Sequence, residues 1–291
     1  MGARRHELVD QCFAQIDQLR GGYFHDRPEL RAAFAAIPRE HFVPARVWWH
    51  RRGADGRFPV LDRTRDPERW LQAVYTADAP LITQIADGAI RAEDGPTACD
   101  DFTSSISCPS VVVNMLHHLN PRPGDRILEI GTGTGYNAAL LAHLVGAANL
   151  VTLESSAPLA ERARATLAAL ANGGPMPEVV VADGELGHKT SAPYTGLIST
   201  ASVQEVPAAW PAQIAEGGVI VVPVATPFGT DALARLVCDG KGSATGSLVA
   251  AVSFMRVRGQ RQPRPWRELG WPRLPDFELS TGPQGQRVHQ R

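Results

Sequence analysis

A glycine-rich turn, EIGTGTGYN at residues 129–137, is the feature that most restricts the folds open to this chain. It follows the short apolar run RILEI (126–130) and precedes YNAALLAHLV (136–145), whose leucines recur at helical spacing. Because glycine has no Cβ, the backbone of this turn can bend tightly and approach a ligand closely. A strand, such a turn and a helix in this order indicate a site for a nucleotide-type cofactor. The three glycines are Gly131, Gly133 and Gly135.

Strand and helix patterns alternate after this turn. Apolar runs predict strands at 150–154, 178–184, 196–200 and 219–224, with helices at 158–171 and at about 205–215. The alternation predicts an α/β fold with a Rossmann-like, doubly wound parallel sheet that helices cover on both faces. Residues 232–238 and 247–257 flank the turn-rich DGKGSATG and predict an antiparallel hairpin at the edge of the sheet.

Two helices and an irregular stretch precede this core. Apolar residues at helical spacing predict helices at 5–20 and 27–37. Residues 47–70 are rich in Arg, Gly and Trp without a clear period, so we expect an insert or long loop that packs through its aromatic side chains. Residues 85–102 are also irregular. The expected parts are N-terminal helices and insert packed on the core (1–102), the α/β core (103–258) and a basic, Pro- and Trp-containing tail (259–291).

Bulk composition excludes several classes of function. The 291 residues are 44% hydrophobic and 20% charged with a formal net charge of −1, which is typical of a globular protein without a nucleic-acid partner. Four cysteines without paired spacing predict neither a metal site nor a disulfide framework and favour a reducing, cytoplasmic compartment. No apolar run approaches the ~20 residues that span a bilayer and no signal-peptide core is present, so no membrane partner is expected.

The tail is locally basic. Eight arginines lie between Arg256 and Arg291, against the three acidic residues Glu268, Asp276 and Glu278. A solvated tail and a tail that binds an acidic partner both fit this pattern.

The neighbours of the glycine turn favour one cofactor. Tyr136 stands where the dinucleotide-binding fingerprint has Gly or Ala, and Glu129 precedes the first glycine by two residues. A carboxylate at Glu129 would repel a pyrophosphate and attract an ammonium group. S-adenosylmethionine carries an ammonium and a sulfonium and no phosphate, so it is favoured over NAD or FAD. The alternative is that Glu129 merely ends a strand.

Two further acidic side chains end the following strands. Glu154 is placed to accept both ribose hydroxyls of an adenosine, and Asp183-Gly184 is placed to meet the adenine edge. Each acid alone could be a solvated strand end. Three acids at three successive strand ends around one glycine turn form the strongest constellation in the chain.

At these residues the sequence resembles the protein-L-isoaspartate O-methyltransferases. The resemblance runs from about residue 30 to 257, with gaps at the Trp-rich insert. It is carried, in order, by PREHFVP (38–44), YTADAPL (75–81), SISCP (105–109), RPGDRILEIGTGTGYNAALLAHLVG (122–146) and VVADGELGHKTSAPYTGLISTAS (180–202). It implies a class I S-adenosyl-L-methionine-dependent methyltransferase with an N-terminal helical segment and a C-terminal extension, a peptide carboxylate as acceptor, and S-adenosyl-L-homocysteine as product.

The resemblance also implies site residues. Ser107 matches the active-site serine of the family, and positions between Thr103 and Ser110 match cofactor contacts. Together with the glycine turn, the predicted cofactor residues are Ser104, Ile106, Ser110, Glu129, Gly131, Thr132, Gly133, Gly135, Tyr136, Asn137, Glu154, Ser155, Asp183 and Gly184.

The hydroxyl-rich run TSSIS suits the chemistry that this family implies. A carboxylate is already ionised at neutral pH, so its attack on a sulfonium methyl group needs alignment and not a general base. Hydroxyl groups can orient the carboxylate and leave one lone pair free, which makes Ser107 the main catalytic candidate, supported by Ser105 and Thr103. One alternative is that a hydroxyl caps the helix expected near Pro109. A serine hydrolase fits poorly because the G-x-S-x-G motif is absent.

Departures from the family pattern bear on the substrate. Cys108, Ser110 and Thr195 differ from the usual residues, and the insert and tail have no counterpart in the short repair enzymes. This layout resembles a longer branch that methylates an aspartate in ribosomally made natural-product precursors, after which the ester closes to an aspartimide. We therefore expect a modified precursor peptide as partner, with general isoaspartyl repair as the alternative. A nonenzymatic precursor-binding scaffold is a third possibility, and the sequence does not define an oligomeric state.

Overall fold

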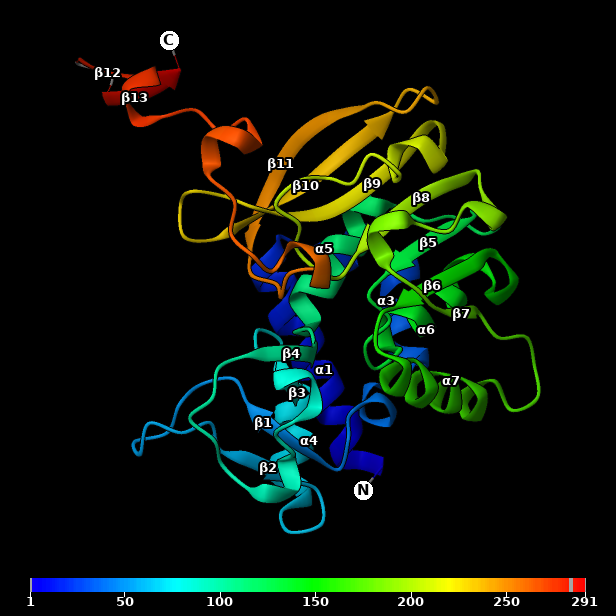
Figure 1. Cartoon of the computed structure of the whole chain (residues 1–291). Helices are drawn as coiled ribbons and strands as arrows, with labels where there is room; N and C mark the ends of the chain where they lie inside the picture. The colour runs from blue at the N-terminus through cyan, green and yellow to red at the C-terminus, as the bar shows by residue number, and fades with distance from the viewer. Residues whose placement is uncertain (1, 283–284, 291) are drawn as a thin grey trace.

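A seven-stranded sheet forms the core of the protein (Figure 1), with the strand order β11-β10-β9-β8-β5-β6-β7. The computed structural model describes residues 2–282 and 285–290. Strands β5 to β9 are parallel to one another, and β10 and β11 add an antiparallel hairpin at one edge, as the sequence predicts. The strands are β5 (Ile127–Ile130), β6 (Leu150–Glu154), β7 (Glu178–Val181), β8 (Tyr194–Ser199), β9 (Ile214–Ala225), β10 (Asp231–Cys238) and β11 (Ala244–Val252).

Helices cover one face of this sheet. They are α5 (Pro109–Leu119), α6 (Tyr136–Val145) and α7 (Ala157–Ala171). Alternate residues of the strands enter two hydrophobic clusters, because successive side chains of a strand point to opposite faces. Ile127 and Leu150 pack with the helices, whereas Leu128 and Val151 belong to a second cluster, in which the described buried residues include none from an α-helix.

The second face differs from the sequence prediction. No α-helix forms at 205–215; the described chain has only the 3-10 turn η7 (Pro211–Gln213) before β9 begins. Pro207 and Pro211 remove two backbone donors from this short stretch, which prevents a continuous helix. Trp210 is fully buried there and donates from Nε1 to the carbonyl of Gly184 at 2.9 Å, so a tryptophan-centred loop covers the face in place of a helix.

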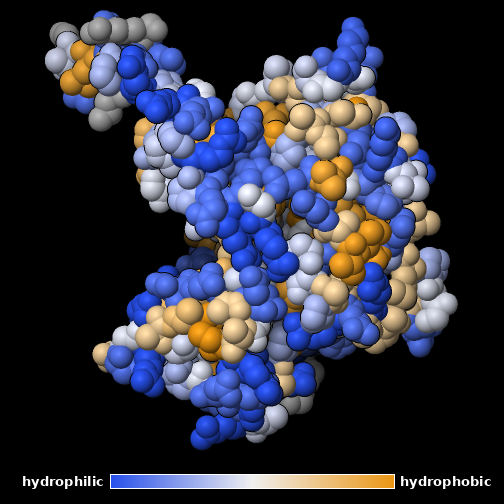
Figure 2. Space-filling view, in the orientation of Figure 1, coloured by the Kyte–Doolittle hydropathy of each residue, from blue (hydrophilic) through white to orange (hydrophobic). Residues whose placement is uncertain are grey.

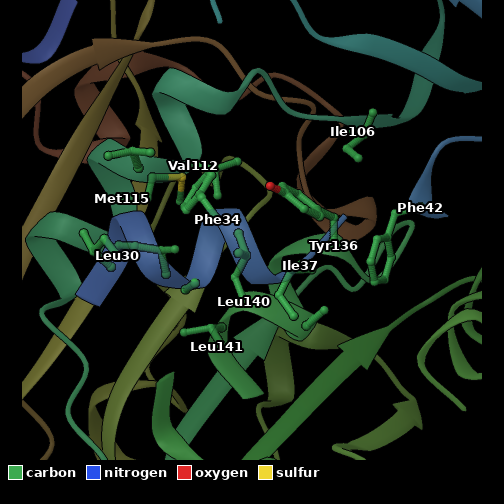
Figure 3. Packing of buried hydrophobic residues seen from close by; sticks show 14 of the residues in the cluster. Leu30, Phe34, Ile37, Phe42, Ile106, Val112, Met115, Tyr136, Leu140 and Leu141 are labelled. Atoms are coloured by element: carbon green, nitrogen blue, oxygen red, sulfur yellow. The ribbon is translucent and has the colours of Figure 1, made fainter. Parts of the chain in front are cut away.

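The N-terminal helices extend the helical layer. They are α1 (Gly2–Arg20), α2 (Tyr23–Asp26) and α3 (Pro28–Ala36), followed by the 3-10 turn η1 (Arg39–Phe42). Figure 3 shows Phe34 of α3 close to Val112 and Met115 of α5 and to Tyr136 at the start of α6. The ring of Phe34 lies edge-on to that of Tyr136, with 6.1 Å between centroids. The first helices therefore share one core with the helices of the large sheet.

A second, four-stranded antiparallel sheet replaces the irregular insert expected at 47–70. Its order is β2-β1-β3-β4, formed by β1 (Arg46–Trp49), β2 (Val60–Asp62), β3 (Leu81–Ile85) and β4 (Phe102–Ile106), with helix α4 (Pro67–Val74) between β2 and β3. The buried side chains of Trp48, Phe58, Ile82 and Ile85 form its own small core. Strands of three to five residues are too short for a period to be read from the sequence. This small sheet includes β4 and so ends beyond the boundary expected at residue 102.

The tail leaves β11 and crosses the molecule before it ends in an exposed hairpin. The hairpin consists of β12 (Phe277–Gly282) and β13 (Gly285–Gln290) and projects from the rest of the protein (Figure 1). The remaining 3-10 turns are η2 (Ala86–Gly88), η3 (Ala92–Asp94), η4 (Ala147–Asn149), η5 (Gly184–Leu186), η6 (Lys189–Ser191), η8 (Arg258–Gln260), η9 (Trp266–Leu269) and η10 (Leu274–Asp276). Within the described residues, no helix has the length and apolar character needed to cross a membrane.

Candidate active site

A pocket lies at the carboxyl ends of β5, β6, β7 and β8. The chain runs from β5 outward through β6 and β7 and then returns to the other side of β5 with β8, so this edge is the topological switch point at which α/β sheets bind ligands. Strand β4 of the small sheet and tail residues 255–261 supply the other walls. Figure 2 shows a mainly hydrophilic face here, with a recess between the small sheet and the rest of the molecule.

The glycine turn needs its glycines for conformation and for space. Gly131, Gly133 and Gly135 have φ angles of 91°, 55° and 87°, a region that favours glycine. A Cβ on Gly131 would lie 2.5 Å from Thr200 Oγ1, so no other residue fits there. A Cβ on Gly133 would lie 3.8 Å from the carbonyl oxygen of Ser105. The turn therefore lies directly against β4, the strand of hydroxyl residues.

The acidic residues at the end of β6 and just after β7, Glu154 and Asp183, both line the pocket. Glu154 accepts backbone N–H groups from Gly133 at 2.9 Å and from Ser156 at 3.0 Å. Asp183 accepts the backbone N–H of Glu185 at 3.0 Å. These two carboxylates are held by the backbone beside the glycine turn, where a diol or an amine of a nucleoside could be bound.

Glu129 is the predicted residue whose surroundings differ most from expectation. Its side chain is fully buried and does not line the pocket. It accepts hydrogen bonds from Asn137 Nδ2 at 2.7 Å and from Thr152 Oγ1 at 2.5 Å. Burial raises the pKa of Glu129 to about 7, against these hydrogen bonds, which lower it. The structure thus places Glu129 behind the glycine turn, where it orients Asn137, a residue that does line the pocket.

The predicted cofactor residues fall into two groups, those that line the pocket and those that lie behind it. The ones that line the pocket are Ser104, Ile106, Gly131, Thr132, Gly133, Tyr136, Asn137, Glu154, Ser155, Asp183 and Gly184. Gly135 begins α6 behind the turn, and Ser110 is buried in the first turn of α5, with its backbone N–H bonded to Ala77 O at 2.9 Å. Gly135, Ser110 and Glu129 therefore do not reach the pocket.

The hydroxyl groups of β4 are not equivalent. Thr103 Oγ1 donates to Gln84 Oε1 at 3.1 Å and accepts the backbone N–H of Asp87 at 3.0 Å. Ser104 Oγ pairs with Thr83 Oγ1 at 3.0 Å. By contrast, Ser105 of β4 and Ser107, just after β4, line the pocket, and their hydroxyls have no hydrogen-bond partner among the described residues. Within residues 103–107, the hydroxyls of these two serines are the ones left for a ligand.

In the structure, the Ser107 hydroxyl does not cap helix α5. Helix α5 begins after Cys108 as N-cap, and the Cys108 side chain makes no capping hydrogen bond. Ser107 instead lies in the short connection between β4 and α5. Its hydroxyl is therefore not required by the helix terminus.

Arg39, from the PREHFVP run, is a site residue that the sequence reasoning did not single out. It is 1% exposed, and its Nη2 donates to the carbonyl of Ser107 at 2.7 Å while its Nε donates to Val74 O at 2.9 Å. Its guanidinium lies over the ring of Tyr136 at 4.9 Å from the centroid. Burial lowers the pKa of Arg39. Arg39 thus fixes the backbone of Ser107 from below the pocket.

The tail contributes a second group of missed residues. Asp87 of η2 pairs with Arg261 at 2.8 Å and with Arg258 at 3.2 Å, and all three line the pocket. The only sequence signal was the basic character of the tail. The partner could not be read from the sequence, because Asp87 lies more than 170 residues away from both arginines.

Fold and site together define a class I, Rossmann-like methyltransferase. Carboxylates and hydroxyls suited to a nucleoside and an ammonium group line the pocket beside the glycine turn GTGTGYN. The family model described as protein-L-isoaspartate(D-aspartate) O-methyltransferase matches residues 93–262. The chain belongs to this family of protein carboxyl methyltransferases, whose methyl donor is S-adenosylmethionine.

Individual relatives of known sequence support the same family. The protein-L-isoaspartate O-methyltransferase of Methanoregula boonei is 37% identical over 207 residues, which cover 71% of this chain and 74% of the relative. The enzyme of the same name from Ignicoccus hospitalis is 40% identical over 243 residues, covering 83% and 92%. These names support the isoaspartyl alternative better than the natural-product reading. Family membership also argues against the third possibility, a nonenzymatic precursor-binding scaffold.

Solved structures confirm the fold. A protein-L-isoaspartate O-methyltransferase superimposes with a TM-score of 0.61 at 22% identity, covering 85% of this chain and 65% of its own. A Plasmodium falciparum protein described as a protein-L-isoaspartate O-methyltransferase, solved with S-adenosyl-L-homocysteine, gives a TM-score of 0.60 at 14% identity, covering 87% and 97%. At these identities the comparison concerns the fold.

Proposed function

We propose that this protein transfers a methyl group from S-adenosylmethionine to a carboxylate of an isoaspartyl or aspartyl residue in a peptide or protein. The observation that carries the proposal is the position of Ser105 and Ser107. Both hydroxyls are unpartnered among the described residues, and the strand that bears Ser105 lies against the glycine turn in one pocket.

The donor, when bound, supplies an electrophilic methyl group. The chain's own task is to hold the acceptor carboxylate in line with that methyl group and to remove water from it. Ser105 and Ser107 can each donate one hydrogen bond to the carboxylate and leave a lone pair free for attack. Arg39 keeps the Ser107 backbone in place, and its charge, buried beneath the pocket, favours a nearby anion. The products are a methyl ester and S-adenosyl-L-homocysteine, and no protein group needs to take up a proton.

Methyl transfer to a synthetic isoaspartyl hexapeptide, followed by mass spectrometry, tests this proposal. We expect a mass increase of one methylene group that depends on the isoaspartyl residue and on the donor. The same peptide with asparagine in place of isoaspartate is the control. Failure to methylate any isoaspartyl or aspartyl peptide, by a protein that binds S-adenosyl-L-homocysteine, would reject it.

A narrower second candidate is methylation of an aspartate in a ribosomally made natural-product precursor, with later closure to aspartimide. It is favoured by the parts of the chain that lie largely outside the residues matched by the family model: most of the small sheet and the exposed hairpin β12–β13. Side-by-side kinetics with isoaspartyl peptides and with a precursor peptide encoded by a neighbouring gene separate the two. Efficient turnover of generic isoaspartyl peptides, with none of the precursor, would reject the narrower candidate.

A further inference from the structure

The structure sorts the arginines of the basic tail into paired and unpaired groups. Arg258 and Arg261 share Asp87, Arg264 pairs with Glu205, and Arg273 pairs with Asp276. These guanidinium groups are occupied by acids of the same chain. Of the three tail arginines that line the pocket, only Arg256 has no ion pair or side-chain hydrogen bond among the described residues.

The backbone holds Arg256 firmly at the pocket wall. Ser202, which follows β8, donates from its N–H to Met255 O at 2.8 Å and accepts the N–H of Val257 at 2.9 Å. These two bonds fix the residues on either side of Arg256. Its side chain is half-buried, so the guanidinium is held near the ligand without being removed from water altogether.

The acids that line the pocket all have other partners. Asp87 is held by two arginines, and Glu154 and Asp183 accept backbone N–H groups. Arg256 therefore faces the pocket with no acid of the chain at ion-pair distance among the described residues. A guanidinium in such a position is suited to bind a carboxylate through two parallel hydrogen bonds.

We propose that Arg256 is a specificity-determining residue that binds a second carboxylate of the substrate, belonging to an acidic residue next to or near the methylated one. This inference rests on the proposed function, because it takes the ligand to be a peptide. The carboxylate bound by Arg256 is not the one that is methylated. A bidentate guanidinium would occupy the lone pairs needed for attack, whereas Ser105 and Ser107 leave one free.

Peptides that differ in one charge test the proposal. Isoaspartyl hexapeptides carry a single glutamate at one of the two positions before or after the isoaspartate, and matched peptides carry glutamine there. We expect the wild-type protein to prefer glutamate at one or more positions by about tenfold in kcat/KM. Arg256→Gln should abolish this preference, Arg256→Lys should keep part of it, and Arg267→Gln, an exposed tail arginine outside the pocket, should leave it intact.

Two measurements separate this proposal from others. Fluorescence anisotropy of the same labelled peptides, with S-adenosyl-L-homocysteine present, reports binding even if isoaspartate is not turned over, so failure of the proposed function is distinguishable. The KM for S-adenosylmethionine should not change in Arg256→Gln. The proposal is overturned if the wild-type protein shows no preference for glutamate, if Arg256→Gln retains the preference, or if Arg256→Gln weakens donor binding and affects all peptides equally.

Discussion

Ser107 lies where strand β4 has ended and helix α5 has not yet begun, so its position depends on its neighbours. Arg39 supplies that support through the Ser107 carbonyl, and the hydroxyl itself has no protein partner among the described residues. Thr103, by contrast, uses its hydroxyl as donor and acceptor within the protein. A hydroxyl that is hydrogen-bonded within the protein has a structural role, whereas a pocket hydroxyl without a protein partner is a candidate for catalysis.

Replacing Ser107 by alanine should therefore act on chemistry more than on donor binding. We expect kcat for methyl transfer to fall by about a hundredfold, because a misaligned carboxylate loses most of the benefit of positioning. The Kd for S-adenosyl-L-homocysteine, measured by calorimetry, should stay the same. Ser107→Thr, which keeps a hydroxyl, is the matched control, and equal losses in kcat and cofactor affinity would show that Ser107 belongs to the cofactor site.

The buried carboxyl of Glu129 predicts a dependence of stability on pH. Its pKa is raised from an ordinary 4.5 to about 7, because burial disfavours the ionised form. The stabilising contribution of Glu129 to the free energy of unfolding is thus fully present below about pH 4.5 and is lost as pH rises through 7. Relative to Glu129→Gln, the wild-type protein should lose up to roughly 3 kcal/mol of unfolding free energy over this interval. Urea unfolding at several pH values checks this, and a constant difference between the two proteins would contradict it.

At the scale of elements, the segment from Met255 to Arg264 ties three parts of the protein together. Arg258 and Arg261 reach Asp87 of η2, which directly follows β3 of the small sheet. The side-chain oxygen of Gln260 accepts the backbone N–H of Gln204 at 2.7 Å in the loop after β8. Since this segment also lines the pocket, its attachment to Asp87 and Gln204 holds one wall of the pocket in place.

Asp87→Asn should loosen this attachment. Asp87 and both arginines are more than a third exposed, so we expect a change of less than about 1 kcal/mol in unfolding free energy. The KM for peptide should rise severalfold, and high salt should raise the wild-type KM in the same way, because salt screens exposed ion pairs. Hydrogen bonds from Arg261 lower the pKa of Asp87, so the attachment is complete at neutral pH and is lost only as pH falls through that lowered pKa. A KM that responds to neither change would show that the bonds of the segment to Ser202 and Gln204 are sufficient to hold it.

At the scale of the whole molecule, the exposed hairpin β12–β13 is an appendage. It projects from the protein, and Leu279 and Val288, which face each other across it, are each 63% exposed. A chain that ends at Asp276 should therefore keep its Tm within about 2 °C and its affinity for S-adenosyl-L-homocysteine. Thermal unfolding with and without that ligand measures both. A large drop in Tm would show that the hairpin packs on the core, whereas unchanged Tm with a raised KM for peptide would assign it to substrate binding.

The sequence predicted those parts of the molecule whose signals are local. The glycine turn, the strands β5, β6 and β8 and the helices α6 and α7 depend on short-range patterns and on buried periodicity, and they lie within a few residues of the expected positions. The small sheet was missed because its strands are short and its pairings are set by distant contacts. The helix expected at 205–215 was wrong because a buried tryptophan and two prolines outweigh its apolar spacing.

In the candidate site, too, the sequence predicted features with local signals and missed those set by distant contacts. The residues of the turn and of the strand ends could be assigned, because the carboxyl edge of a parallel sheet gathers them. The sequence could not show which of these residues face the pocket, because the direction of the Glu129 and Ser110 side chains depends on the packing around them. Arg39 and Asp87 act through partners far away in sequence, and no spacing rule connects such pairs.

The glycine turn and the serine strand β4 belong to two frameworks, the large and the small sheet. One face of the small sheet, with Leu81 and Ile106, packs in the same core as Ile127 of the large sheet, and its other face has a small cluster of its own. The glycine turn extends from β5 of the large sheet, while the serine strand β4 pairs, among the described strands, with β3 of the small one. A sub-ångström slip between these frameworks would lengthen the path of the methyl group without disturbing either fold. Volume-conserving substitutions at the seam between the two sheets should therefore leave stability and donor affinity nearly unchanged and yet slow turnover.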